Sequence, residues 1–205
     1  MIIAKLENKD VEELTLNSKN ALGEVIQYDT TYFKDLERLE TITLNCFDVN
    51  NDLIEKINCL NKLKTIIFNH CKFICDNKLK NNIENIIITY SNIANSSVFE
   101  KQEKLKTIEL IGIDEVDINN FIEMKNLEEI SIYNSKIKNS KKISDFANLK
   151  VLKLDGSLVD EPNFSDLIDN NIEFSYNEKF YLEENKQWII EMKNWHTILY
   201  IIPFL

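Results

Sequence analysis

Apolar residues recur along this chain in one spaced pattern instead of long runs. In the copy that begins at Leu149, apolar side chains occupy the first, fourth, sixth and eleventh places, and Ser157 occupies the ninth. Six earlier copies, the first of them a looser match, begin at Val11, Leu39, Leu63, Ile83, Leu105 and Leu127. Successive copies start 28, 24, 20, 22, 22 and 22 residues apart. A period of this length indicates a repeat array in which each unit buries its apolar side against the next.

The fourth and sixth places of each copy predict a short β-strand. Side chains two residues apart on a strand share one face, so these apolar residues point into the core. The third, fifth and seventh places then point outward. An apolar residue three places before a copy, such as Leu36 or Met124, continues a helical or 3₁₀ return segment on the opposite side. We expect return segments at 52–57, 116–124 and 143–147, and an eighth strand at 172–176.

Taken together, the seven copies resemble the leucine-rich repeat family in its 22-residue form. The resemblance implies an α/β solenoid with a curved parallel sheet on the concave side and short helices or 3₁₀ segments on the convex side. The ninth place in this family usually carries asparagine, which bonds neighbouring backbone groups along the turn. In this chain the ninth place holds Phe47, Cys71, Ser91, Ile113, Ser135 and Ser157. Phe47 and Ile113 depart from the family pattern, so we expect less regular turns there.

The last part of the chain departs from the repeat pattern. Trp188, Met192 and Trp195 stand at i, i+4 and i+7, which predicts an amphipathic helix over 183–195, and a strand is expected at 197–202. A solenoid must cover its open end, and an aromatic-rich terminal unit suits that role. The alternative is that the two tryptophans form an exposed docking surface. We therefore divide the chain into a repeat array over residues 1–181 and a capping helix and strand over residues 182–205.

The charge balance narrows the range of partners. The formal net charge is −10, and Arg38 is the one arginine in the sequence. Nucleic-acid readers need clustered Lys and Arg, so we expect no direct nucleic-acid binding. No stretch approaches the ~20 apolar residues that cross a bilayer, and the first residues lack a secretory pattern. We expect a cytoplasmic protein without membrane contact, whose acidic surface serves solubility or steers a basic partner.

Residues able to do nucleophilic or metal chemistry are few. The histidines are His70 and His196, and the four cysteines form no Cys-x-x-Cys. Cys46, His70 and Tyr90 take the eighth place of three successive copies, so they are expected in a row with Cys71 alongside. Such a row is either a weak metal or nucleophile site or a polar strip beside the sheet. Its spacing lacks the signature of a four-ligand metal site. We predict no catalytic residue, no metal and no cofactor.

The outward places of the strands carry the remaining signal. Most are small and polar, but Ile67, Ile87, Ile111 and Tyr133 form a diagonal apolar track over four consecutive strands. Exposed contiguous apolar surface often marks a contact site, although β-branched residues are favoured in strands anyway and a loop can cover such a track. We predict a protein partner on the concave face, bound by Asn45, Thr65, Ile67, Asn69, Asn85, Ile87, Thr89, Glu109, Ile111, Ser131, Tyr133, Lys153 and Asp155.

The predicted function is therefore a non-enzymatic protein–protein interaction module. A more specific alternative is an inhibitor or immunity-type protein that neutralises a basic enzyme or toxin, in keeping with the acidic balance. An enzyme that uses Cys46 and His70 is a second class. A structural scaffold that associates with itself through the apolar C-terminus or an unpaired edge strand is a third.

Overall fold

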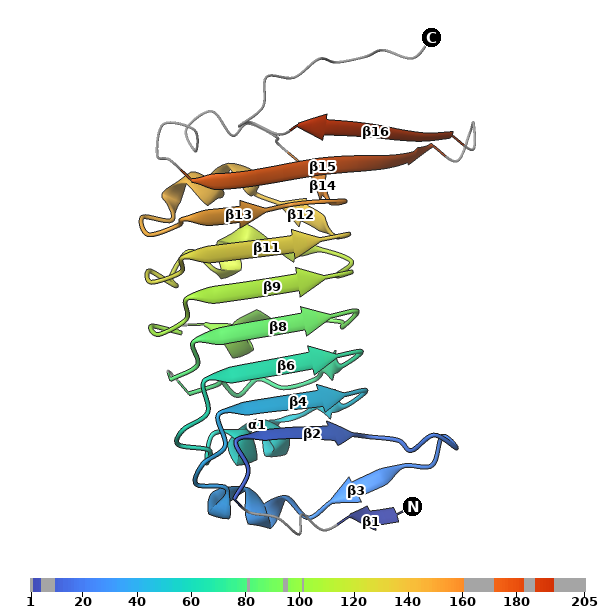
Figure 1. The fold of residues 1–205 in the computed structure, drawn as a ribbon, viewed down its shortest axis with the longest axis vertical. Helices are drawn as coiled ribbons and strands as arrows, with labels where there is room; N and C mark the ends of the chain where they lie inside the picture. The colour runs from blue at the N-terminus through green and yellow to red at the C-terminus, as the bar shows by residue number, and fades with distance from the viewer. Residues whose placement is uncertain are drawn as a thin grey trace.

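The computed structural model describes residues 2–4, 10–80, 82–93, 96–100, 102–160, 172–182 and 187–193. These residues form an α/β structure in which one nine-stranded sheet runs along the long axis of the molecule (Figure 1). Eight of the strands are parallel, and the ninth, at one edge, is antiparallel to its neighbour. The expected α/β class with a large parallel sheet is confirmed.

The parallel strands appear in the sheet in the order in which they appear in the sequence. They are β2 (Glu13–Asn17), β4 (Thr41–Asn45), β6 (Thr65–Asn69), β8 (Asn85–Thr89), β9 (Thr107–Ile111), β11 (Glu129–Tyr133), β13 (Val151–Lys153) and β15 (Glu173–Leu182). From β2 to β13, neighbours pair with equal places opposite each other, for example Thr41 with Thr65. The repeat pattern of the sequence therefore translates into straight rows of like places across the sheet.

The rows at the fourth and sixth places form the core. Ile66, Ile86 and Ile108 occupy the fourth place of three successive strands and have no exposed surface. Phe68 and Leu110, at the sixth place, are equally buried. Burial of a side chain of this size contributes about 1.5–3 kcal/mol relative to exposure, so two rows running the length of the sheet account for much of the fold's stability.

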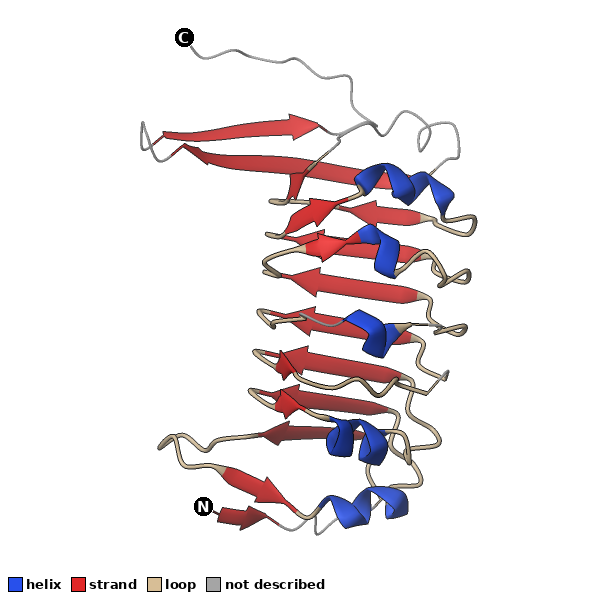
Figure 2. Cartoon of the chain, turned by 180° about the vertical axis from the view of Figure 1, so that it is seen from behind, coloured by secondary structure: helices blue, strands red, loops and turns tan. Residues whose placement is uncertain are grey.

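The opposite side of the core is closed by short return segments, which lie behind the sheet (Figure 2). They comprise η1 (Thr30–Asp35), α1 (Asn51–Ile57), η2 (Ser96–Phe99), η3 (Ile118–Asn120) and η4 (Ser140–Asp145), with the short strands β5 (Asp48–Val49), β7 (Lys72–Phe73), β10 (Val116–Asp117), β12 (Lys136–Lys138) and β14 (Leu158–Val159). The return predicted at 52–57 is confirmed as a helix, and those at 116–124 and 143–147 overlap 3₁₀ turns.

The helix α1 shows how a return segment is fixed. The side chain of Asn50 caps its first turn by accepting a hydrogen bond from the backbone N–H of Leu53 at 2.9 Å. Leu53, Ile54 and Ile57 then point into the core. Their spacing of one, three and four residues places them on one side of the helix, which is why this segment packs behind the sheet.

The two ends of the sheet are built differently from its middle. At the N-terminal end, β1 (Ile2–Ala4) pairs with β3 (Ile26–Tyr28). At the C-terminal end, β15 extends beyond the predicted strand at 172–176 and turns back as β16 (Gln187–Lys193). The predicted strand at 197–202, together with Trp195 and His196, lies outside the described residues.

The helix predicted over 183–195 is wrong for residues 187–193, which form a strand. The apolar residues Trp188, Ile190 and Met192 alternate with a period of two, so the same stretch carries a strand signal beside its helical spacing. The extended end of β15 offers seven residues for antiparallel pairing, from Tyr176 with Lys193 to Leu182 with Gln187. Pairing with β15 therefore favours the strand over the helix for residues 187–193.

Candidate protein-interaction surface

The open face of the sheet is the face that carries the third, fifth and seventh places. Figure 1 looks onto this face, and no described segment crosses in front of it. All thirteen residues predicted to bind a partner occupy outward places on β4 to β13 or within two residues after the end of a strand. Ser131 is buried and the other twelve are half-buried. The structure thus brings the predicted residues onto one continuous surface.

The apolar track of Ile67, Ile87, Ile111 and Tyr133 is continuous in space. Ile67 pairs directly with Ile87, and Ile111 pairs directly with Tyr133. Ile87 and Ile111 lie on adjacent strands two places apart, because Ile87 faces Glu109 across the pair. Diagonal neighbours of this kind remain within reach of long side chains. The track therefore crosses the face obliquely from β6 to β11.

The first half of the open face, over β2 to β8, bears an amide ladder, which we define as Asn17, Asn45, Asn69 and Thr89. Asn45 donates through Nδ2 to Asn17 Oδ1 at 2.8 Å, and Asn69 donates in the same way to Asn45. The Thr89 hydroxyl closes the series by donating to Asn69 Oδ1 at 2.7 Å. Each inner amide thus donates to one strand and accepts from the next. The ladder directs its hydrogen bonds along the sheet instead of outward.

The second half of the open face, over β9 to β15, has a different polar pattern. A hydroxyl and an ammonium group converge on Glu129. Ser131 Oγ donates a hydrogen bond to Glu129 Oε1 at 3.2 Å, and Lys153 Nζ lies 3.6 Å from the same oxygen. Asp155 accepts a hydrogen bond from the Ser175 hydroxyl at 2.8 Å. Glu109 lies among these groups, and its side chain has no hydrogen bond or ion pair with any described residue.

The eighth places form a strand-end ridge along the edge at which the strands end. Its members all adopt a left-handed backbone with φ between 47° and 71°: Cys46, His70, Tyr90, Gly112, Asn134 and Gly156. In the five members from Cys46 to Asn134, the backbone N–H of the eighth residue donates to the seventh-place carbonyl of the next strand, as from His70 to Thr89 at 2.9 Å. Glycine and asparagine tolerate such a backbone, so their presence at this place was a usable sequence signal.

The predicted row of Cys46, His70 and Tyr90 is present on this ridge. The rings of His70 and Tyr90 stack with centroids 5.3 Å apart and planes inclined by 14°. The other neighbour of the Tyr90 ring is Gly112, where a Cβ atom would lie 2.5 Å from ring carbons Cδ1 and Cε1. The glycine thus leaves the space that the tyrosine ring fills.

Tyr90 extends the candidate surface beyond the thirteen residues predicted to bind a partner. It is 58% exposed, and its backbone N–H donates to the carbonyl of Ile111, a member of the apolar track. The sequence predicted Tyr90 in a row with Cys46 and His70, either a weak metal or nucleophile site or a polar strip, and did not predict it as a partner-binding residue. The eighth place directly follows the seventh in sequence. This adjacency could have indicated that the strand-end ridge borders the open face of the sheet.

The thiol of Cys71, the residue that follows His70 of the ridge, is unsuited to nucleophilic chemistry. Cys71 is buried, and its thiol donates to the carbonyl of Leu44 at 3.3 Å. Burial raises the pKa of this thiol from an ordinary value near 9.0 to about 11, so it stays protonated at neutral pH. Among the residues that the structure describes, no group of three or more His, Cys, Asp or Glu side chains is arranged to hold a metal ion.

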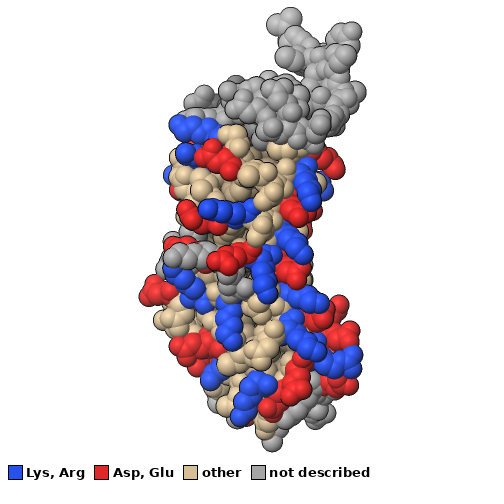
Figure 3. All heavy atoms as spheres, turned by 90° about the vertical axis from the view of Figure 1, so that its left-hand side faces the viewer, with Lys and Arg blue, Asp and Glu red and all other residues tan. Residues whose placement is uncertain are grey.

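A charge ladder lies along the edge at which the strands begin. It occupies the second place and alternates in sign over Glu40, Lys64, Glu84, Lys106, Glu128 and Lys150. Ion pairs of 2.9, 2.9 and 2.7 Å join its successive members two by two. Figure 3 looks onto this edge and shows acidic and basic side chains interleaved along it. The ladder is neutral as a whole, so it gives this edge no single sign of charge.

The ion pairs of the charge ladder also favour the ionised form of two of its carboxylates, Glu84 and Glu128. A hydrogen bond from Lys106 lowers the pKa of the Glu84 carboxyl, and one from Lys150 lowers the pKa of Glu128. A hydrogen bond from the Lys64 ammonium to Glu40 raises the pKa of that lysine. These groups already have partners within the chain and are poor candidates for a ligand site.

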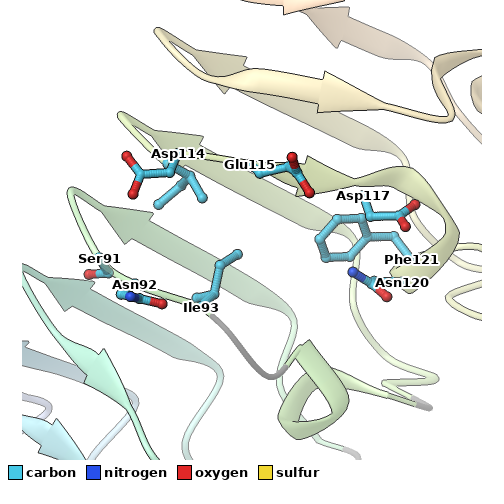
Figure 4. A pocket seen from close by; sticks show the side chains of 9 residues that line it. Ser91, Asn92, Ile93, Asp114, Glu115, Asp117, Asn120 and Phe121 are labelled. Atoms are coloured by element: carbon cyan, nitrogen blue, oxygen red, sulfur yellow. The ribbon is translucent and has the colours of Figure 1, made fainter. Parts of the chain in front are cut away.

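A hollow of about 240 Å³ lies on the return side between two neighbouring repeats (Figure 4). Ile93 and Phe121 contribute apolar walls, and acidic side chains stand around it. Two of the carboxylates are already engaged. Glu115 pairs with Lys138 at 2.7 Å, and Asp117 accepts hydrogen bonds from the Asn119 backbone and the Asn139 side chain, both at 2.9 Å. The hollow therefore offers no convergent set of free groups.

Comparison with known proteins gives no family assignment: no family model matches the chain, and no curated protein matches it either. None of the helices in the described ranges is both long enough and apolar enough to cross a membrane. The functional conclusion accordingly rests on the surface itself.

Proposed function

We propose that this chain is a leucine-rich-repeat protein whose open sheet face binds another protein, with no catalytic activity of its own. The observation that carries the proposal is the apolar track of Ile67, Ile87, Ile111 and Tyr133 on a sheet face that no described segment crosses. A track of this kind on a solvent-facing sheet is an interaction feature, because burying it releases water from apolar surface.

The assignment to the leucine-rich repeat is supported by the turns after the strands. At the ninth place, Ser135 accepts a hydrogen bond from the backbone N–H of Ile113 at 3.0 Å, and Ser157 accepts one from Ser135 at 3.3 Å. Ser91 does the same for Cys71 at 2.9 Å. Small polar side chains that bond the backbone of the preceding unit match the role of asparagine at this place in the family. The resemblance to this family implies protein recognition on the sheet face.

Within the open face, we place the centre of the contact over β8, β9 and β11. Tyr133 supplies an aromatic anchor, Ile87 and Ile111 supply apolar surface beside it, and small polar residues surround them. This is the composition of an interface centre, where a few aromatic and apolar residues carry most of the binding free energy. Asn45 and Asn69 belong to the rim, since their amides already bond each other.

The test compares a double variant of the track with a matched control. Ile87→Asp with Tyr133→Asp places two charges on the track, whereas Ile74→Asp with Leu158→Asp makes the same kind of change at two exposed apolar residues off the sheet face. Proteins cross-linked to each form in native lysate are identified by mass spectrometry, after circular dichroism has established that both variants are folded. A protein retained by the wild type and the control and lost from the track variant supports the proposal.

The proposal fails if the track variant retains the same proteins as the wild type. It also fails if the control variant loses them to the same extent, because that outcome places the contact off the sheet face. Purified partner, measured by calorimetry, should bind the track variant at least about a hundredfold more weakly, the range expected for loss of central interface residues.

A second candidate is an inhibitor that neutralises a basic enzyme or toxin. The net charge of −10 favours it, because an acidic protein attracts basic partners at long range. Its signature is an association rate that falls steeply with salt. A complex whose association rate is unchanged between low and physiological salt would exclude electrostatic capture of this kind.

A further inference from the structure

Glu109 differs from every other charged residue at the centre of the open face. It stands on β9 at the fifth place, directly opposite Ile87 on one side and Ser131 on the other. Its side chain is half-buried, and it forms no hydrogen bond or ion pair with any residue that the structure describes. A carboxylate without a partner therefore lies beside the apolar track.

The neighbours of Glu109 have polar groups, but these point elsewhere. On β11, the Ser131 hydroxyl donates to Glu129 at 3.2 Å. Lys153 lies two strands away on the same row, and its ammonium turns to the same Glu129 at 3.6 Å. The nearest cation in the row thus serves the neighbouring carboxylate.

The strand on the other side of Glu109 offers no donor either. The Asn85 amide donates to the Thr65 hydroxyl at 3.1 Å, and the Thr89 hydroxyl donates to Asn69 at 2.7 Å. Both donors point toward β6 and away from β9. Consequently, none of these hydrogen bonds on either side of β9 includes the Glu109 carboxylate.

A partner that covers the apolar track must also remove water from Glu109. Desolvation of an ionised carboxylate costs free energy unless a hydrogen-bonded cation replaces the water. Lysine and arginine carry aliphatic stems that pack along apolar surface while the charged group reaches beyond it. Arginine also offers a planar set of donors that matches a carboxylate. Ile87, Ile111 and Tyr133 surround Glu109 and provide the surface for such a stem.

Building on the protein-binding face proposed above, we infer that the partner inserts an arginine or lysine side chain that pairs with Glu109 and lays its stem along the apolar track. The partner segment is thus basic at its centre and apolar on either side of the cation. Glu109 selects the partner by charge, and Ile87, Ile111 and Tyr133 supply the apolar contact.

The inference is tested with a phage-displayed library of random peptides about twelve residues long, a length that spans several strands. The library is selected on the full chain and, in parallel, on Glu109→Gln, Glu109→Lys and Ile87→Asp with Tyr133→Asp. Glu123→Lys, a charge reversal at an exposed residue of the return side, is the matched control. The leading peptide is then synthesised with and without its basic residue for calorimetry.

We expect the wild type and Glu123→Lys to enrich peptides with an arginine or lysine flanked by apolar residues, and Glu109→Lys to lose this preference. The leading peptide should bind Glu109→Gln at least about tenfold more weakly than wild type, as for removal of one partner of a hydrogen-bonded charge pair. Exchange of its basic residue for glutamine should weaken binding to wild type equally and have no further effect on Glu109→Gln.

The remaining outcomes separate this inference from the proposed function. Peptides that lose affinity for the track variant but bind Glu109→Gln within about twofold of wild type would overturn the role of Glu109 and leave the binding face standing. Selection of basic peptides by Glu109→Lys, or no basic preference in the wild type, would overturn it as well. Peptides that bind the wild type and the track variant alike would instead overturn the proposed face.

Discussion

The two halves of the open face share the same strand geometry but differ in how their polar side chains are hydrogen-bonded. Over β2 to β8, Asn17, Asn45 and Asn69 repeat one polar side chain, and each amide hydrogen-bonds the next. Over β9 to β15, the seventh place changes to Ile111 and Tyr133, and the polar groups no longer form a chain. The backbone pairing is continuous through this change, since β8 and β9 pair over five residues.

This difference shows that polar side chains on a sheet face favour binding only if their hydrogen-bonding groups are not already paired within the chain. A row of amides that satisfy one another gains little from a new contact, because a partner must first replace hydrogen bonds that already exist. A carboxylate such as Glu109, which has no partner for its side chain and lies beside apolar side chains, would gain a hydrogen-bonded cation from the partner that we propose. The amide ladder is therefore a structural seam, whereas the proposed contact lies on the apolar track and at Glu109.

The largest effect on stability is expected where the halves meet, at Gly112. Gly112→Ala should lower the free energy of unfolding by about 2–4 kcal/mol, measured by chemical denaturation. Its left-handed backbone with φ of 62° disfavours a side chain, and the new Cβ would lie 2.5 Å from two carbons of the Tyr90 ring.

Two controls divide that cost into its parts. Gly23→Ala also has a left-handed backbone, with φ of 78°, but meets no atom within 4 Å, so it should lose only the backbone contribution of about 1–2 kcal/mol. In a Tyr90→Ala background, the cost of Gly112→Ala should fall to the same value. An undiminished cost in that background would mean that the ring is not what Gly112 accommodates.

The second largest effect is a pH dependence confined to the first half. Cys71 fills the ninth place there, whereas Ser135 and Ser157 fill it in the second half. Burial raises the pKa of the Cys71 thiol to about 11 in the folded protein, so the unfolded chain loses this proton first. The free energy of unfolding should fall by about 2–3 kcal/mol as the pH rises from about 9 to about 11.

The matched variant for this titration is Cys71→Ser, which places a non-titrating residue of similar size at the same turn. Urea denaturation of both proteins at several pH values between about 8 and 11 isolates the thiol, because the other alkaline titrations are common to both. Parallel stability curves for the two proteins over this range would contradict the assignment.

The smallest effects contrast the two halves directly. Asn45→Ala removes one donor and one acceptor from the amide ladder, so Asn17 Oδ1 loses its donor and Asn69 Nδ2 loses its acceptor. It should cost about 1–2 kcal/mol of stability and leave partner affinity nearly unchanged. Glu109→Gln should change stability by no more than about 0.5 kcal/mol and weaken partner binding. Equal stability losses in denaturation experiments on the two variants would remove the distinction between seam and binding surface.

The rows of the sheet could be predicted from the sequence because they depend on period alone. Alternation at the fourth and sixth places fixes which face each residue takes, and a one-place slip would expose the whole apolar set. The apolar track from Ile67 to Tyr133 followed from this rule, and so did the row of Cys46, His70 and Tyr90.

The features that could not be predicted depend on side-chain orientation and on pairing between strands. The sequence places Lys153 near two carboxylates, and only the side-chain geometry assigns it to Glu129 and leaves Glu109 without a cation. At the C-terminal end, residues 187–193 satisfy a helical and a strand period at once. The choice of strand follows from the length of β15, which no local pattern in 187–193 encodes.

The charge ladder along the strand starts has a consequence for assembly. Its signs alternate from Glu40 to Lys64 to Glu84 to Lys106, one sign per repeat. If one repeat were looped out and its neighbours joined, Glu40 would face Glu84 or Lys64 would face Lys106, and like charges directly opposite destabilise a strand pair. Omission of two repeats would restore opposite signs. Between Glu40 and Lys150, the ladder therefore disfavours a sheet from which a single internal repeat has been left out.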